Sequence, residues 1–183
     1  MKKTIWTFGL ISGAILSVMM LVTIPFASSI GYDRAEIIGY TTLVLAFLLI
    51  FFGIRSYRDN VAGGSVRFGQ AFKVGALIAL IASICYVATW EVIYFKIAPE
   101  FSDRFKAARL EKVRASGATA EEIARETAEI ERFAVRYRNP FFNAAVTFIE
   151  PLPLGLVVAL VSAGVLSRRR KTANGALAPS TVT

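Results

Sequence analysis

The feature that most constrains this chain is a set of four long apolar stretches that carry almost no charge. They occupy residues 5–26, 37–54, 74–97 and 141–167. Each is close to the roughly 20 residues that a helix needs to cross the hydrocarbon core of a bilayer. The sequence therefore predicts an all-α membrane protein with four transmembrane helices. We expect these helices to contact the lipid bilayer.

The composition agrees with this prediction and excludes several kinds of site. Of the 183 residues, 55% are apolar and 19% are charged, against about 45–50% and 25% in an ordinary soluble domain. The chain has no histidine and a single cysteine, Cys85. Ser–His and Cys–His nucleophile pairs, His-ligated metal sites and an internal disulfide are therefore excluded. We expect no cofactor, no metal and no enzymatic activity.

The first apolar stretch has two interpretations. A basic start at residues 1–3 and the small residues at 27–29 resemble a signal peptide with its cleavage site. However, the apolar run is longer than the roughly 7–15 residues of a signal core. It also carries Gly9, Gly13 and Ser17 at four-residue spacing, which is typical of helix packing in membranes. We therefore interpret residues 5–26 as a retained span.

Similar stripes of small residues recur in two other spans. They are Gly75, Ala79 and Ala82 in the third span and Gly155, Ala159 and Ala163 in the fourth. Small residues let helix backbones approach closely where lipid provides no hydrophobic drive between helices. The sequence leaves open whether these faces meet within one chain or between chains. A homo-oligomer and a membrane-protein partner are both compatible with it.

The polar segment 99–139 has the pattern of two helices. Phe101, Phe105 and Ala108 recur at helical spacing, and Gly117 is a plausible helix stop. Thr119 and Glu122 then fit a capping box, the reciprocal side chain–backbone pair that begins many helices. Ile123, Ile130, Phe133 and Tyr137 share one face of the second helix. We expect an amphipathic helical hairpin between the third and fourth transmembrane helices.

This hairpin has two possible roles. It either caps the bundle as an extension of the third and fourth spans, or it lies on the membrane or binds a partner. Its nine basic and eight acidic residues nearly cancel, which argues against attraction to nucleic acid. Basic residues near helix ends in short loops weigh most in setting orientation. By that rule we expect both termini inside and the 99–139 hairpin outside. Residues 172–183 form a polar tail that we expect to be disordered.

Two carboxylates inside the apolar stretches are the candidate functional residues. An acid within a span costs about 2.5–3.5 kcal/mol on insertion scales and therefore marks a candidate site. Antiparallel third and fourth spans place Glu91 and Glu150 in the same outer half of the bilayer. Pro151 and Pro153 remove backbone donors next to Glu150 and leave carbonyl oxygens free.

Other polar side chains are expected at the same depth as the two carboxylates. They are Tyr94, Asn143, Thr147 and Tyr40. Together these groups form a candidate proton or cation site. The alternatives are a purely structural role for both acids, or acid–base chemistry on a lipid-borne substrate. We interpret the chain as a non-enzymatic accessory or interaction module, and a small oligomeric transporter or channel using Glu91 and Glu150 is the alternative.

Five segments carry a resemblance to a known family. They are residues 51–60 (FFGIRSYRDN), 67–75 (RFGQAFKVG), 86–90 (YVATW), 138–140 (RNP) and 150–155 (EPLPLG). With these segments the chain resembles the bacterial membrane-protein family called domain of unknown function 4199, over about residues 5–167. The resemblance implies a multi-pass protein of the bacterial cytoplasmic (inner) membrane. It implies no activity and no catalytic residue.

Overall fold

The computed structural model of the protein describes residues 1–167, and this part of the chain is helical, without strands. The elements are α1 (Lys2–Thr23), η1 (Ile24–Phe26), α2 (Ala27–Ile30), α3 (Tyr32–Asn60), α4 (Phe68–Val92), η2 (Ile93–Ile97), α5 (Phe101–Ala115), α6 (Ala120–Tyr137), α7 (Pro140–Phe148) and α8 (Pro151–Leu166). The basic run 168–171 and the tail 172–183 expected to be disordered lie outside the described residues.

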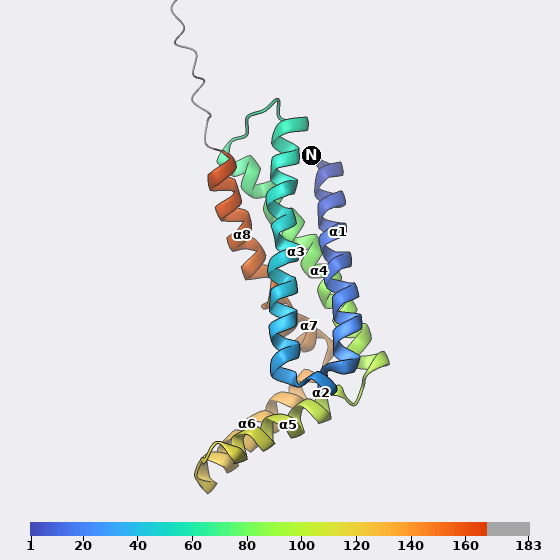
Figure 1. Ribbon diagram of the computed structural model, residues 1–183, viewed down its shortest axis with the longest axis vertical. Coiled ribbons are helices and arrows are strands. Elements are labelled where there is room, and N and C mark those ends of the chain that lie inside the picture. The colour runs from blue at the N-terminus through green and yellow to red at the C-terminus, as the bar shows by residue number, and fades with distance from the viewer. Residues whose placement is uncertain (168–183) are drawn as a thin grey trace, which may run out of the picture.

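Four helical segments are long and apolar enough to cross a membrane. They are Lys2–Ile30, Tyr32–Asn60, Phe68–Ile97 and Pro140–Leu166. The prediction of an all-helical chain with four such helices is confirmed. The segments run side by side as a bundle, with the N-terminus and the α3–α4 connection at one end and α5 and α6 at the other (Figure 1).

The core of the bundle is built around α4, which packs against α1, α3 and α8. Close approach is possible because small residues face one another. A Cβ added to Gly13 of α1 would lie 2.6 Å from Cβ of Cys85, and one added to Gly155 of α8 would lie 2.7 Å from Cβ of Ala79. The small-residue stripes left unassigned by the sequence therefore meet within one chain.

The fourth span is a broken helix. α7 ends at Phe148, Ile149 and Glu150 form a turn, and α8 begins at Pro151. A proline fits the first position of a helix because the backbone N–H there has no partner within that helix. The break places Glu150 at the N-cap of α8, but its side chain makes no capping hydrogen bond. The carboxylate is therefore available to other partners.

The segment between the third and fourth spans forms two helices, α5 and α6, which lie side by side and project obliquely from the bundle (Figure 1). The turn between them uses Gly117 at a φ of +76°, a left-handed conformation that glycine adopts without steric cost. α6 begins with the predicted capping box. The Glu122 N–H donates to Oγ1 of Thr119 at 3.3 Å, and the Thr119 N–H donates to Oε2 of Glu122 at 2.8 Å.

Candidate functional site

A cavity of about 790 Å³ lies where the bundle meets α5 and α6. Its lining comes from the end of α1, the start of α3, the end of α4, the start of η2, the α7–α8 turn, and one side each of α5 and α6. Small-molecule sites in proteins occupy about 300–1,000 Å³. The cavity therefore has the size of a ligand site and is partly open to the surroundings.

Aromatic rings form a large part of the cavity wall and join α5 to the bundle. The Tyr32 ring of α3 meets that of Phe105 edge to face at 5.5 Å between centroids. The Trp90 ring of α4 meets that of Phe101 in the same manner, also at 5.5 Å. Edge-to-face pairs of this kind stabilise beyond the area that they bury. An ion pair from Lys112 to Asp33, 2.9 Å long, adds an exposed contact between α5 and α3.

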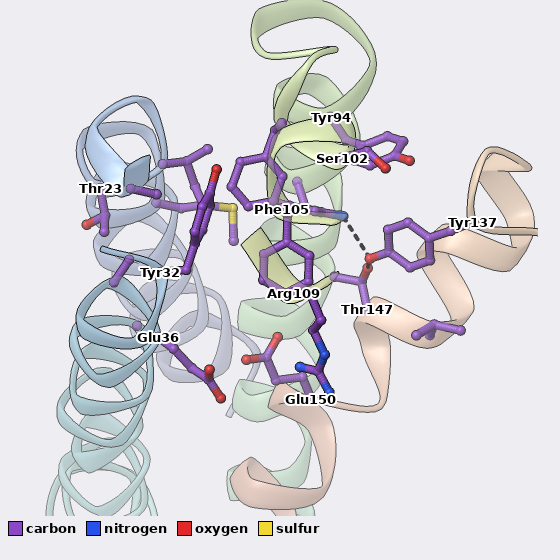
Figure 2. A pocket seen from close by; sticks show the side chains of 18 of the residues that line it. Thr23, Tyr32, Glu36, Tyr94, Ser102, Phe105, Arg109, Tyr137, Thr147 and Glu150 are labelled. Atoms are coloured by element: carbon purple, nitrogen blue, oxygen red, sulfur yellow. Dashed lines mark hydrogen bonds between the residues drawn. The ribbon is translucent and has the colours of Figure 1, made fainter. Parts of the chain in front are cut away.

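The cavity is more acidic than basic. Its charged lining residues are Glu36, Glu126, Glu129, Glu150, Lys106 and Arg109, four acids against two bases. Within residues 1–167 none of these six forms an ion pair with another of them. Figure 2 shows the side chains of Glu36, Glu150 and Arg109 directed into the same space. The chain as a whole carries a net charge of +8, so this acidic cavity stands out from the rest of the protein.

Glu150 is oriented by a tyrosine of another helix. The Tyr86 hydroxyl of α4 donates a 2.8 Å hydrogen bond to Oε2 of Glu150. This bond directs the carboxylate at the break in the fourth span towards α4 and the cavity. The other carboxylate oxygen of Glu150 makes no hydrogen bond within the described part of the chain.

A closed set of hydrogen bonds joins α4, α6 and α7 beside the cavity. Figure 2 shows Tyr137 and Thr147, two of its members. The Trp90 Nε1–H donates to the Tyr137 hydroxyl at 3.1 Å, and this hydroxyl lies 2.9 Å from Oγ1 of Thr147. Thr147 donates to Oδ1 of Asn143 at 3.2 Å. Asn143 then donates to the backbone carbonyl of Tyr137 at 3.1 Å. Since Thr147 gives its proton to Asn143, Tyr137 is the donor to Thr147.

The hydrogen bonds among Trp90, Tyr137, Thr147 and Asn143 pair polar atoms that lie inside the protein. Asn143 is fully buried, and Thr147 is nearly so. Burial raises the pKa of the Tyr137 phenol, so the hydroxyl stays protonated and able to donate. Buried polar groups stabilise a fold only when their partners are present. The arrangement therefore fixes the end of α6 on α4 and α7.

The structure brings most of the predicted site residues together. Tyr40, Tyr94, Thr147 and Glu150 line the cavity. Asn143 does not line it but accepts a hydrogen bond from Thr147. Tyr94 belongs to η2, the π-helical turn that ends the third span. π-Helical turns are frequent at functional sites.

Glu91 is not among the lining residues. Five residues after Tyr86, its side chain points about 140° away around the helix. Oε1 of Glu91 is buried without a hydrogen-bond partner in residues 1–167. No hydrogen bond from Glu91 to Tyr94 or to another helix is found within these residues. Glu91 therefore points away from the side of α4 on which Tyr86 binds Glu150.

The sequence analysis missed several lining residues, among them Glu36, Tyr86, Lys106, Arg109, Glu126 and Glu129. Glu36 lies one residue before the predicted start of the second span, and Tyr86 lies within an apolar run. Lys106 and Arg109 belong to the polar segment that follows the third span. The spacing of Tyr86, Trp90 and Tyr94 by four residues was an available signal, because such residues share one helix face. No sequence signal placed α5 over that face.

Four apolar helices of spanning length define the class of the molecule as a helical membrane protein, and a largely apolar cavity with several polar side chains lies at one end of the bundle. Among the described residues no group of three or more His, Cys, Asp or Glu side chains is placed to hold a metal ion. A family model described as "Protein of unknown function (DUF4199)" matches residues 7–168. The chain therefore belongs to this family. No curated protein and no solved structure matches it.

Proposed function

We propose that the protein is a non-enzymatic, multi-pass protein of the bacterial cytoplasmic membrane that binds a small amphipathic molecule between its bundle and the α5–α6 pair. The observation that carries this proposal is the cavity of about 790 Å³ with apolar walls and converging polar side chains. Such a combination is the usual form of a ligand site. The protein then acts as a binding or accessory module of the membrane.

The position of the cavity supports an amphipathic ligand. Its lining includes the last residues of one span and the first of the next, with Thr23 in α1 and Tyr32 in α3. Tyrosine and tryptophan side chains concentrate around it, which is typical of the boundary between membrane and water. A ligand with an apolar part and a polar part is stable at this boundary. We place both termini on the cytoplasmic side and this boundary on the external side.

We interpret α5 and α6 as an amphipathic hairpin that covers this end of the bundle. Ile130, Phe133 and Tyr137 of α6 line the cavity, as do Phe101 and Phe105 of α5. These five are among the residues whose helical spacing predicted an apolar face, whereas Ala108 and Ile123 of the same predicted faces do not line the cavity. An apolar face that lines a cavity in the same chain favours the capping role over binding to the membrane surface.

Transport by a proton or cation site is the alternative function, and it requires Glu91 and Glu150 at one place. Glu150 lines the cavity, whereas Glu91 does not. The arrangement of these two carboxylates gives no support to a shared site. Ligand binding is therefore the function that we propose.

The chain offers a direct test because its two tryptophans, Trp6 and Trp90, lie at different places. Trp90 lines the cavity, and Trp6 is 57% exposed near the opposite end of α1. In lipid nanodiscs, the Trp6→Phe variant reports the cavity alone and the Trp90→Phe variant reports the bilayer background. The probe is a long-chain alkanol brominated at the end of its chain, because bromine quenches tryptophan fluorescence on contact.

We expect saturable quenching of Trp90 at probe concentrations where Trp6 shows only a gradual, unsaturated decrease. Equal, unsaturated quenching of the two tryptophans would show that the cavity binds no amphipathic molecule. The Trp90→Phe variant removes the hydrogen bond to Tyr137, so its folding is compared with that of the wild type by circular dichroism.

A further inference from the structure

We propose that the ligand of this cavity is a lipophilic organic cation, whose charge is balanced by Glu36 and Glu150 and whose apolar body lies against the aromatic wall. This inference rests on the proposed binding function and adds the charge class of the ligand. It is carried by the charge of the lining, by the unpaired state of the two carboxylates and by the surrounding rings.

The charge of the cavity favours a cation. The lining has two more acidic than basic residues, although the chain has a net charge of +8. The basic residues Lys106 and Arg109 offset only part of the acidic lining. Because the cavity walls are largely apolar, the carboxylates interact with an entering charge more strongly than they would in water. A positively charged ligand lowers the electrostatic energy of the cavity, and an anion raises it.

The two central carboxylates are available to a ligand. Within residues 1–167, Glu36 makes neither a side-chain hydrogen bond nor an ion pair, and Glu150 accepts only the bond from Tyr86. Both side chains keep exposed surface that faces the cavity. They approach it from opposite sides, Glu36 from α3 and Glu150 from the α7–α8 turn (Figure 2). A cation between them meets a carboxylate on each side.

The size of the cavity and its aromatic lining favour an organic cation over a metal ion. Tyr40, Tyr86, Trp90 and Tyr94 line the same space as the two carboxylates. The faces of such rings attract organic cations because the ring quadrupole places negative charge on the faces. A small hydrated metal ion instead needs several oxygen ligands at short range, and a space of about 790 Å³ is far larger than such an ion.

A pair of probes with the same shape and opposite charge tests the inference. Tetraphenylphosphonium and tetraphenylborate are titrated against the Trp6→Phe variant in nanodiscs, with Trp90 fluorescence as the readout and the Trp90→Phe variant as the bilayer background. We expect tetraphenylphosphonium to bind at least ten times more tightly than tetraphenylborate. We also expect Glu36→Gln and Glu150→Gln, each made in the Trp6→Phe background, to weaken phosphonium binding about tenfold.

The matched control is Glu131→Gln, which removes an exposed carboxylate of α6 that is not among the lining residues. It should leave phosphonium binding unchanged. Glu36→Gln breaks no hydrogen bond within the described residues, so this variant decides the outcome if Glu150→Gln does not fold. The inference is overturned if the borate binds as tightly as the phosphonium, or if Glu36→Gln leaves phosphonium affinity at the wild-type value.

The result also separates this inference from the proposed function. Saturable quenching by the brominated alkanol, with no preference between phosphonium and borate, would keep the binding site and remove its charge selectivity. The absence of a saturable Trp90 response to the alkanol and to both tetraphenyl probes would overturn the binding function itself.

Discussion

The Tyr86 hydroxyl lies 2.8 Å from Oε2 of Glu150, although 64 residues separate the two along the chain. Glu150 occupies the N-cap of α8, where a carboxylate commonly accepts hydrogen bonds from its own helix. Here the side chain makes no such bond and accepts one from α4 instead. The break in the fourth span thus turns a carboxylate towards another helix and into the cavity.

Removing this hydroxyl should lower stability by a modest amount. Tyr86→Phe leaves the ring in place and removes one side-chain hydrogen bond, which is worth about 0.5–1.5 kcal/mol. We expect a loss of this size in the free energy of unfolding, measured by titration with a denaturing detergent. The matched control is Tyr40→Phe, because the Tyr40 hydroxyl lines the cavity without a hydrogen bond in residues 1–167. An equal loss in both variants would show that the bond to Glu150 contributes nothing.

Replacing Glu91 by an apolar residue should raise the stability of the protein. Oε1 of this side chain is buried and has no hydrogen-bond partner in the described part of the chain. A buried polar atom left without a partner costs about 1–3 kcal/mol. We therefore expect Glu91→Leu to raise the free energy of unfolding by roughly 1 kcal/mol or more in the same titration. A marked loss of stability in Glu91→Leu would show that Glu91 has a partner that stabilises the fold.

Tyr137 should control how firmly α6 is held. Tyr137→Phe leaves Trp90 without its acceptor and Thr147 without its donor. We expect amide hydrogen exchange in the last two turns of α6 to accelerate roughly tenfold, since about 1.4 kcal/mol corresponds to a factor of ten. The control is Tyr32→Phe, whose hydroxyl makes no hydrogen bond within residues 1–167. Unchanged exchange in α6 of Tyr137→Phe would contradict this role.

The α4–α8 contact should tolerate no added methyl group at Gly155. Its new Cβ would lie 2.7 Å from Cβ of Ala79, whereas a Cβ at Gly164 of the same helix meets nothing within 4 Å. Overpacking typically costs about 1–3 kcal/mol, and glycine in an open helical position is less stable than alanine. We expect Gly155→Ala to lower the melting temperature and Gly164→Ala to leave it unchanged or raise it. The reverse order would mean that α4 and α8 do not pack at Gly155.

The stability of the capping box at the start of α6 should decrease at acid pH. The Thr119 backbone N–H, joined by the Thr119 hydroxyl, holds the pKa of the Glu122 carboxyl below its ordinary value of 4.5. A carboxyl with a lowered pKa in the folded state contributes stability above its unfolded pKa. That contribution is lost as the pH falls through the lower, folded value. We expect a side-chain carbon NMR titration of Glu122 to show a midpoint below 4.5.

Thr119→Ala removes one of the two donors to Glu122 and should move that midpoint upwards. The matched control is Thr127→Ala on the same helix, whose hydroxyl bonds to the Ile123 carbonyl rather than to Glu122. It should leave the Glu122 midpoint in place. A midpoint at or above 4.5 in the wild type would contradict the capping box in solution.

The sequence by itself determined the four apolar helices, the start of α6 and the loss of backbone donors at Pro151 and Pro153, where the structure then showed a break in the fourth span. These features depend on neighbouring residues alone. An apolar run of spanning length, the reciprocal bonds of Thr119 and Glu122, and the missing donor of Pro151 each act within a few residues. Local patterns of this kind can be identified before any tertiary contact is known.

Only the tertiary structure decided which side chains meet. Glu91 and Glu150 look equivalent in the sequence, but helix rotation directs Glu91 away from the cavity that Glu150 lines. Glu36 joins Glu150 there because the start of α3 faces the α7–α8 turn across the cavity. The contacts of the small-residue stripes likewise depend on the packing of α4 against α1 and α8. The physical reason is that rotation and packing between helices depend on contacts between distant residues, which no local pattern encodes.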